Sequence, residues 1–189
     1  FGQQVGDPHN GHPTWQTPPP AQQFNEAVGL AAPNTGSIFV PRMTRNASEP
    51  QYRVQANGKK VAAQVPGEKV FVTPGEYTVV IGSGADDSLL TFDATVVEGE
   101  TTYIPVEWGS LLVSILDERG NPFRGGYELV KLPDRDYVGI GLGADVAKGE
   151  RLTAWYLPPG LYMILSPGES YQARRNFITI RIMPGQLSH

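Results

Sequence analysis

The chain contains one pattern twice, as FVTPGEYTVVIGSG from Phe71 to Gly84 and as YLPPGLYMILSPG from Tyr156 to Gly168. In each copy, Pro-Gly is followed by one residue, a tyrosine and a hydrophobic run that ends at glycine or proline. Proline fixes φ and glycine permits positive φ, as a type II turn requires. A run that is apolar on both faces is typical of a strand inside a sandwich. The pattern therefore predicts a turn and a central strand, and turn geometry and packing explain it without a ligand.

The chain from Gly36 onward consists of short apolar runs separated by turn signals. No window offers a helical period over about ten residues. The run GSIFV at 36–40 corresponds to GSLLV at 109–113, so the same order of elements occurs twice. We predict an all-β fold with two tandem small β-sandwich domains preceded by an extended Pro/Gln-rich N-terminal arm. The predicted boundaries are 1–35 for the arm, 36–108 for the first sandwich and 109–189 for the second.

Several of these motifs resemble those of known families. Pro-Gly-x-Tyr before a hydrophobic strand, together with VVEGETTYIPV at 96–106, resembles PEGA domains and the wider prealbumin-like or carboxypeptidase-regulatory-like sandwiches. SILDERGNPFRGGYELV at 114–130 is also similar to the B-type repeats of surface adhesins, although more weakly. The resemblance covers residues 36–186. It implies an exported or cell-surface protein that serves as a spacer or an interaction module.

The composition narrows the range of functions. The 189 residues carry a net charge of −4 with scattered Lys and Arg, so we expect no nucleic-acid partner. The sequence has no cysteine, which excludes disulfides, thiolate metal sites and a cysteine nucleophile. No apolar run is long enough for a transmembrane segment. The chain begins with Phe1, and together with the family resemblance this favours a removed export signal and a periplasmic, cell-surface or extracellular location.

Candidate catalytic and metal-binding residues are few. Two of the three histidines, His9 and His12, lie beside Asp7 in the arm, where they could bind Zn²⁺ or Cu²⁺. Nothing on a Pro/Gly-rich stretch pre-organises these ligands, so we favour ordinary polar residues and keep them only as weak metal candidates. No nucleophile elbow and no Ser–His–Asp set is present. We therefore expect no catalytic residues, no enzymatic activity and no cofactor.

The passage VGIGLGAD at 138–145 has glycine at every second position. A dinucleotide-binding fingerprint needs different spacing, with a strand before it and a helix after it. Alternating glycines instead indicate a flat or bulged strand, or a close approach of another segment to the backbone.

Aromatic residues are the remaining candidates for partner binding. Trp15 and Phe24 could anchor the arm. Trp155 and Tyr156 are adjacent, so on a regular strand their rings point to opposite faces. One ring is then expected in a core and the other at a surface or at the joint between domains, unless both faces are buried.

The leading hypothesis is a non-enzymatic exported subunit that docks other protein subunits of a larger assembly through its arm and its sandwich surfaces. One alternative is a carbohydrate-binding module that uses exposed aromatic side chains. A second is metal binding by the histidine-containing arm. Under any of these, function is expected where the two copies differ, in the arm, the glycine-rich passage and the Trp155–Tyr156 pair.

Overall fold

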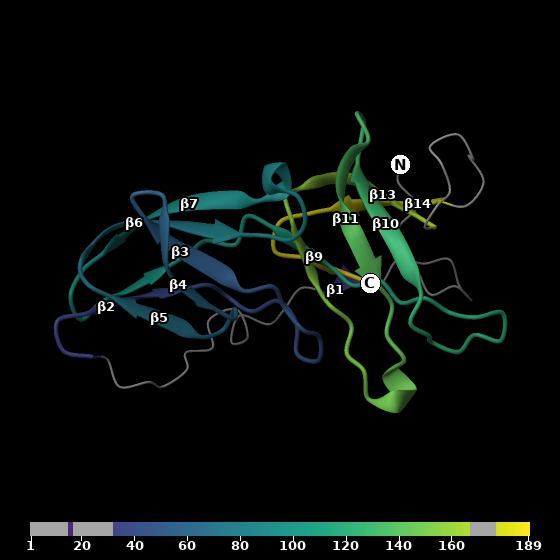
Figure 1. Cartoon of the computed structure of the whole chain (residues 1–189), viewed down its shortest axis with the longest axis horizontal. Helices are drawn as coiled ribbons and strands as arrows, with labels where there is room; N and C mark the ends of the chain where they lie inside the picture. The colour runs from purple at the N-terminus through teal and green to yellow at the C-terminus, as the bar shows by residue number, and fades with distance from the viewer. Residues whose placement is uncertain (1–14, 17–31, 167–176) are drawn as a thin grey trace.

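The computed structural model of the chain describes residues 15–16, 32–166 and 177–189. This part of the chain is almost entirely β-structure, with two short 3-10 helices, η1 (Asp86–Ser88) and η2 (Val146–Lys148). The predicted all-β class is confirmed. Figure 1 shows the strands as two sandwiches placed end to end along the long axis of the molecule.

The first sandwich has two sheets whose inner faces meet in one core. Ile38, Val54 and Val79 come from different strands of these sheets and are fully buried there. The smaller sheet has the order β5 (Lys69–Val72), β2 (Gly36–Phe39), β8 (Thr101–Tyr103), and the larger has the order β4 (Lys59–Gln64), β3 (Tyr52–Ala56), β6 (Gly75–Ile81), β7 (Leu90–Val96).

The second sandwich also has two sheets, and it includes a short strand from the predicted arm. Trp15 pairs with Ser188 and Gln16 with Leu187, so this piece of the arm lies on the second sandwich of its own chain. One sheet has the order β1 (Trp15–Gln16), β15 (Leu187–Ser188), β9 (Gly109–Leu111), β12 (Trp155–Leu157), and the other has the order β11 (Asp136–Leu142), β10 (Gly126–Lys131), β13 (Gly160–Leu165), β14 (Phe177–Ile182).

Apart from β1, the two sandwiches correspond strand for strand. The order β4-β3-β6-β7 matches β11-β10-β13-β14, and β5-β2-β8 matches β12-β9-β15. In their sheets, β2 and β9 are each antiparallel to one neighbour and parallel to the other. A domain boundary at Trp108 and Gly109 stays a prediction.

The sheets that contain β4 and β11 carry a bulge at the same place in their first hairpin. In β4, Val61 is the extra residue between the pairs Val54–Ala62 and Gln55–Lys60. In β11 the extra residue is Val138, between the pairs formed by Gly139 and Tyr137 with β10. β4 and β11 are therefore equivalent edge strands with a common register.

The repeated Pro-Gly-x-Tyr pattern begins the central strands β6 and β13, as predicted. The type II turn is wrong, because φ is 156° at Gly75 and 157° at Gly160 instead of about 80°. Residues other than glycine rarely adopt φ values in this range. The tyrosine has a role that the pattern did not reveal: Tyr77 donates to the Thr73 carbonyl at 2.6 Å, and Tyr162 donates to the Pro158 carbonyl at 2.7 Å.

Candidate functional site

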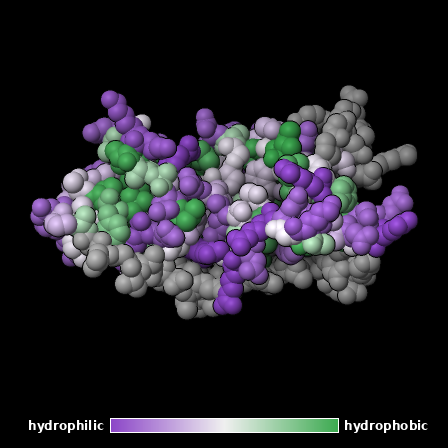
Figure 2. Space-filling view, turned by 60° about the horizontal axis from the view of Figure 1, so that its bottom comes forward, coloured by the Kyte–Doolittle hydropathy of each residue, from purple (hydrophilic) through white to green (hydrophobic). Residues whose placement is uncertain are grey.

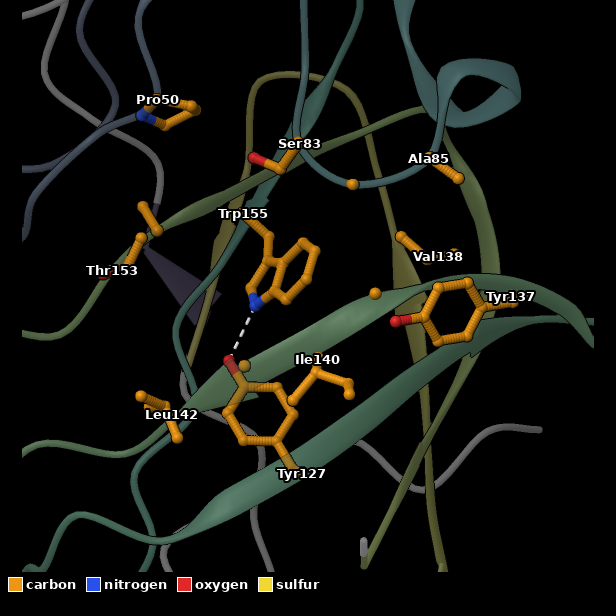
Figure 3. A pocket seen from close by; sticks show the side chains of 14 residues that line it. Pro50, Ser83, Ala85, Tyr127, Tyr137, Val138, Ile140, Leu142, Thr153 and Trp155 are labelled. Carbon is orange, nitrogen blue, oxygen red and sulfur yellow. Dashed lines mark hydrogen bonds between the residues drawn. The ribbon is translucent and has the colours of Figure 1, made fainter.

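A groove of about 610 Å³ lies where the second sandwich meets the first. The first sandwich contributes Pro50 and the loop Ser83–Ala85, and the second contributes strand β11, Tyr127 and the segment Thr153–Trp155. Figure 3 shows the indole of Trp155 between that loop and β11, and the side chain of Tyr137 beside the same strand. The lining contains no charged side chain, which suits an apolar occupant.

Two aromatic rings form the floor of the groove. Trp155 donates its Nε1 hydrogen to the Tyr127 hydroxyl at 2.6 Å, and the ring centroids are 6.4 Å apart. Burial raises the pKa of Tyr127, although the hydrogen bond from Trp155 acts in the opposite direction. The phenol is therefore a neutral group that fixes the orientation of the indole.

The glycines of β11 leave room for these rings. A Cβ at Gly139 would come within 2.9 Å of Trp155, and a Cβ at Gly141 would overlap the Tyr127 ring. The predicted close approach and the predicted bulged strand are both confirmed in this passage. Alternating glycines thus let two aromatic rings lie against the edge strand of a sheet.

The opposite face of β11 exposes apolar side chains. Tyr137 is 49% exposed, Ile140 61% and Leu142 48%. Figure 2 shows that hydrophobic residues on the face it presents form separate patches bordered by hydrophilic side chains, on both sandwiches. Apolar residues that border a groove along a strand edge are candidates for partner contact.

Tyr156 connects the two sandwiches. Its backbone belongs to β12 of the second sandwich, while its ring is fully buried in the core of the first. There it stacks on Trp108 with ring centroids 5.7 Å apart. Since Trp155 points into the second core, the adjacent pair supplies one ring to each core.

A buried carboxylate holds the Tyr156 hydroxyl. Glu49 Oε1 accepts hydrogen bonds from this hydroxyl at 2.8 Å, from Met43 N at 2.8 Å and from Thr44 N at 2.7 Å. The Glu49 side chain is 4% exposed, and Oε2 lies 3.5 Å from Nε of Arg42. Burial raises the pKa of Glu49, and these hydrogen bonds oppose the shift. Burial, followed by the nearby Glu49 charge, raises the pKa of Tyr156.

Backbone hydrogen bonds also cross the joint. Ser48 N donates to Leu152 O at 2.9 Å, and Ala154 N donates back to Ser48 O at 2.8 Å. Further along, Ser83 N donates to the carbonyl of Tyr156 at 3.2 Å. The two sandwiches are therefore joined by main-chain contacts as well as by packing.

The four predicted partner-binding residues have different surroundings in the structure. Trp155 lines the groove but is only 7% exposed, and Tyr156 has no exposed surface, so a free surface role for the Tyr156 ring is wrong. Trp15 is described only through its backbone pairing, and Phe24 lies outside the described residues. The sequence did not single out Glu49, Tyr137 as a groove residue, or the loop Ser83–Ala85.

The weak metal candidates Asp7, His9 and His12 also lie outside the described residues. Within residues 15–16, 32–166 and 177–189, no three His, Cys, Asp or Glu side chains come together as a metal site. The third histidine, His189, lies 2.7 Å from the Ser114 hydroxyl, and burial lowers the pKa of its ring. None of the helices described in the structure has the length and apolar character needed to cross a membrane.

Comparison with known proteins gives little further information. No family model and no curated protein matches the chain. Among solved structures, the chain is similar to one described as the Bacillus anthracis TIE protein, with 14% identity and a TM-score of 0.31. The match covers 80% of this chain but only 32% of that protein, so the chain spans about a third of its length. A similarity at this level identifies no family.

Proposed function

We propose that this chain is a non-enzymatic structural and interaction subunit, in which two rigidly joined sandwiches act as a spacer and a docking surface in a larger assembly. The observation that supports the proposal best is the joint at Tyr156, where a residue of one sandwich completes the core of the other. Because domains within one chain usually move relative to each other unless their interface is extensive and apolar, such a joint favours a fixed geometry.

Opening the joint has a large cost. Removing the Tyr156 ring from the first core would expose a large aromatic surface, comparable to the loss of about 3–5 kcal/mol when a buried aromatic side chain is truncated. Glu49 Oε1 would lose one of its three donors at the same time, and one hydrogen bond contributes about 0.5–1.5 kcal/mol to stability. These two terms support a single orientation of the sandwiches.

The location of this subunit follows from the resemblance to PEGA-like and related sandwiches. On that basis we place it outside the cytoplasm, in a cell-envelope or extracellular assembly. The arm is a second proposed docking element, although its residues Trp15 and Gln16 pair with their own chain. Deleting residues 1–30 should weaken assembly and leave both sandwiches folded, and normal assembly of the truncated chain would remove the arm from the proposal.

The spacer role can be tested by measuring the distance between the sandwiches. Because the chain has no cysteine, Asp93→Cys and Arg181→Cys place one spin label on an exposed site of each sandwich. Pulsed electron paramagnetic resonance should give one narrow distance distribution, and the added change Tyr156→Ala should broaden it. A broad or bimodal distribution in the doubly labelled chain with Tyr156 intact would contradict a rigid spacer.

A glycan-binding role is the second candidate, because three aromatic residues, Tyr127, Tyr137 and Trp155, surround one groove. Sugars normally need several convergent polar groups as well, and the side chains of the lining offer the hydroxyls of Ser83, Thr153 and the two tyrosines. Binding on a glycan array that is lost in Tyr137→Ala would favour this role. Binding that persists in Tyr137→Ala would place any glycan site elsewhere.

A further inference from the structure

β11 is the edge strand of its sheet, and its backbone leaves hydrogen-bonding groups directed away from β10. Gly143 N donates to Gly125 O at 2.8 Å, which continues the ladder between the two strands. Since hydrogen-bonded pairs alternate along an antiparallel ladder, Gly141 and Gly139 form the next bonded pairs. The N–H and C=O groups of Ile140 and Leu142 therefore point outward, and none of the described residues bonds to them.

The groove follows this edge. All residues from Tyr137 to Leu142 line the groove. A cavity over one face of a strand would be lined by every second residue, because successive side chains point to opposite faces. An occupant of the groove would thus lie beside the strand, within reach of the outward backbone groups of Ile140 and Leu142.

The first sandwich already forms a hydrogen bond with the N-terminal part of the β11 edge. Ala85 N donates to Val138 O at 2.8 Å, and Gly84 approaches so closely that a Cβ there would overlap Val138. The edge from Ile140 to Leu142 continues this interface in the direction of the groove. A further segment of extended chain would extend a pairing that the molecule has already begun.

The equivalent edge in the first sandwich is built differently. By the common bulge register, β4 has Lys60 where β11 has Tyr137, and Ala63 where β11 has Ile140. Lysine on an edge strand opposes pairing with other chains, whereas an exposed apolar edge favours it. The β11 edge therefore lacks the lysine that β4 has at the register of Tyr137, and it exposes a larger apolar side chain at Ile140 than β4 has at Ala63.

We propose that an extended apolar segment of a partner protein adds to the β11 edge at Ile140–Leu142, with one side chain in the groove over Trp155; this rests on the docking role proposed above. Such strand addition uses main-chain hydrogen bonds for affinity and a pocket for specificity. Glu128 lies opposite Ile140 in the ladder, and Asp86 and Asp87 follow Ala85. The surrounding charge favours a segment with basic residues at its ends.

A second copy of this chain fits the edge less well. Two β11 strands paired about a two-fold axis would each need a free edge over the paired length. The loop Gly84–Ala85 occupies that edge at Val138, so only the short length from Ile140 to Leu142 is open for such a pairing. The partner is therefore a different protein.

The probe for this proposal is the fluorescein-labelled peptide acetyl-Lys-Val-Thr-Val-Thr-Val-Lys-amide, titrated with the full chain and followed by fluorescence anisotropy. Saturable binding is expected. Ile140→Pro removes one outward N–H without removing a bond to β10, and it should weaken binding about tenfold, as expected for one lost hydrogen bond. The matched control Ala63→Pro, at the equivalent site of β4, should bind the peptide as the unaltered chain does.

A second probe keeps the test decisive if Ile140→Pro fails to fold. The same peptide with N-methylated central amides cannot pair with a strand edge, and it should not bind the unaltered chain. Equal binding of both peptides, or equal loss in Ala63→Pro and Ile140→Pro, would overturn strand addition at β11. A concentration-dependent dimer that Ile140→Pro abolishes would show that a second copy is the occupant and overturn the proposed partner.

No binding of the peptide would also overturn this inference. The spacer role would remain, because the distance between the spin-labelled sandwiches does not depend on the β11 edge.

Discussion

Strands β4 and β11 occupy the same place in two sandwiches of the same topology, yet the side chains that they expose differ in character. β4 carries Lys59 and Lys60 at its start, and Val61 at its bulge is 51% exposed. β11 exposes Tyr137, and Val138 at its bulge is 1% exposed, beneath the loop of the first sandwich. The difference teaches that topology fixes where an edge lies, while the side chains and the neighbouring domain decide whether it is available for binding.

The largest expected effect comes from breaking the joint at Tyr156, where a residue of β12 in the second sandwich fills the core of the first. Tyr156→Ala should lower the free energy of unfolding by about 3–5 kcal/mol, because it leaves a cavity beside Trp108. Denaturant unfolding followed by circular dichroism measures this loss. The control Tyr137→Ala removes an aromatic ring that is half exposed and should cost less than about 1 kcal/mol. Equal losses would mean that Tyr156 is not a core residue of the joint.

Two substitutions of Glu49 distinguish the effect of its hydrogen bonds from the effect of its charge at the same joint. Glu49→Ala should lower the free energy of unfolding by about 3 kcal/mol, because the buried Tyr156 hydroxyl and the Thr44 N–H lose their acceptor, and the Met43 N–H keeps only the Tyr156 hydroxyl oxygen at 3.2 Å. Glu49→Gln keeps an oxygen at this position and should fall within about 1 kcal/mol of the unaltered chain. Equal losses in both variants would show that the charge, and not the acceptor, is needed.

The pH dependence of Glu49→Gln gives a further check. The pKa of Glu49 is raised in the folded state, so its stabilising contribution is fully present below its unfolded pKa and is lost as the pH rises through the raised value. The unaltered chain should therefore lose stability relative to Glu49→Gln on going from pH 4 to pH 7, and urea unfolding at several pH values would measure this. A difference that changes in the other direction would contradict the raised pKa.

The glycines of β11 test why its surface differs from that of β4. By the common register, β4 has Ala62 and Gln64 where β11 has Gly139 and Gly141. Gly141→Ala should cost about 1–3 kcal/mol, because its Cβ overlaps the Tyr127 ring. Tryptophan fluorescence should also change as Trp155 loses its fixed partner. At the position of β4 that is equivalent to Gly139, Ala62→Gly should cost only about 0.5–1 kcal/mol, from the greater freedom of the unfolded chain.

The smallest effect on stability is expected from exchanging the two surfaces. Tyr137→Lys gives β11 the lysine that β4 has at the same register, and Lys60→Tyr gives β4 the tyrosine of β11. Each change at an exposed site should alter the free energy of unfolding by less than about 0.5 kcal/mol. Peptide binding should nevertheless fall in Tyr137→Lys, whereas Lys60→Tyr should leave it unchanged. Unchanged binding in both variants would mean that the exposed face of β11 takes no part.

The sequence predicted the fold well, because fold-determining signals are local. Pro-Gly-x-Tyr located the central strands, and the alternating glycines indicated a close approach at β11. The type II turn was wrong because glycine at φ near 156° begins the strand directly, and the tyrosine hydroxyl then bonds to the carbonyl four residues before it.

The site was less predictable, because it depends on contacts between distant segments. The pair Trp155–Tyr156 indicated opposite directions for the rings, but not that Tyr156 enters the core of the other sandwich. Glu49 and the loop Ser83–Ala85 lie in irregular segments without a pattern, and only the docking of the sandwiches gives them their contacts.

The most direct test of the central claim is amide hydrogen exchange resolved by NMR, with and without the lysine-flanked peptide. In the free protein the amides of Ile140, Leu142 and Ala63 should all exchange fast, because each points outward from an edge strand. On addition of the peptide, the amides of Ile140 and Leu142 should slow and that of Ala63 should not. Equal slowing at Ala63, or no slowing at Ile140 and Leu142, would contradict a selective docking edge at β11.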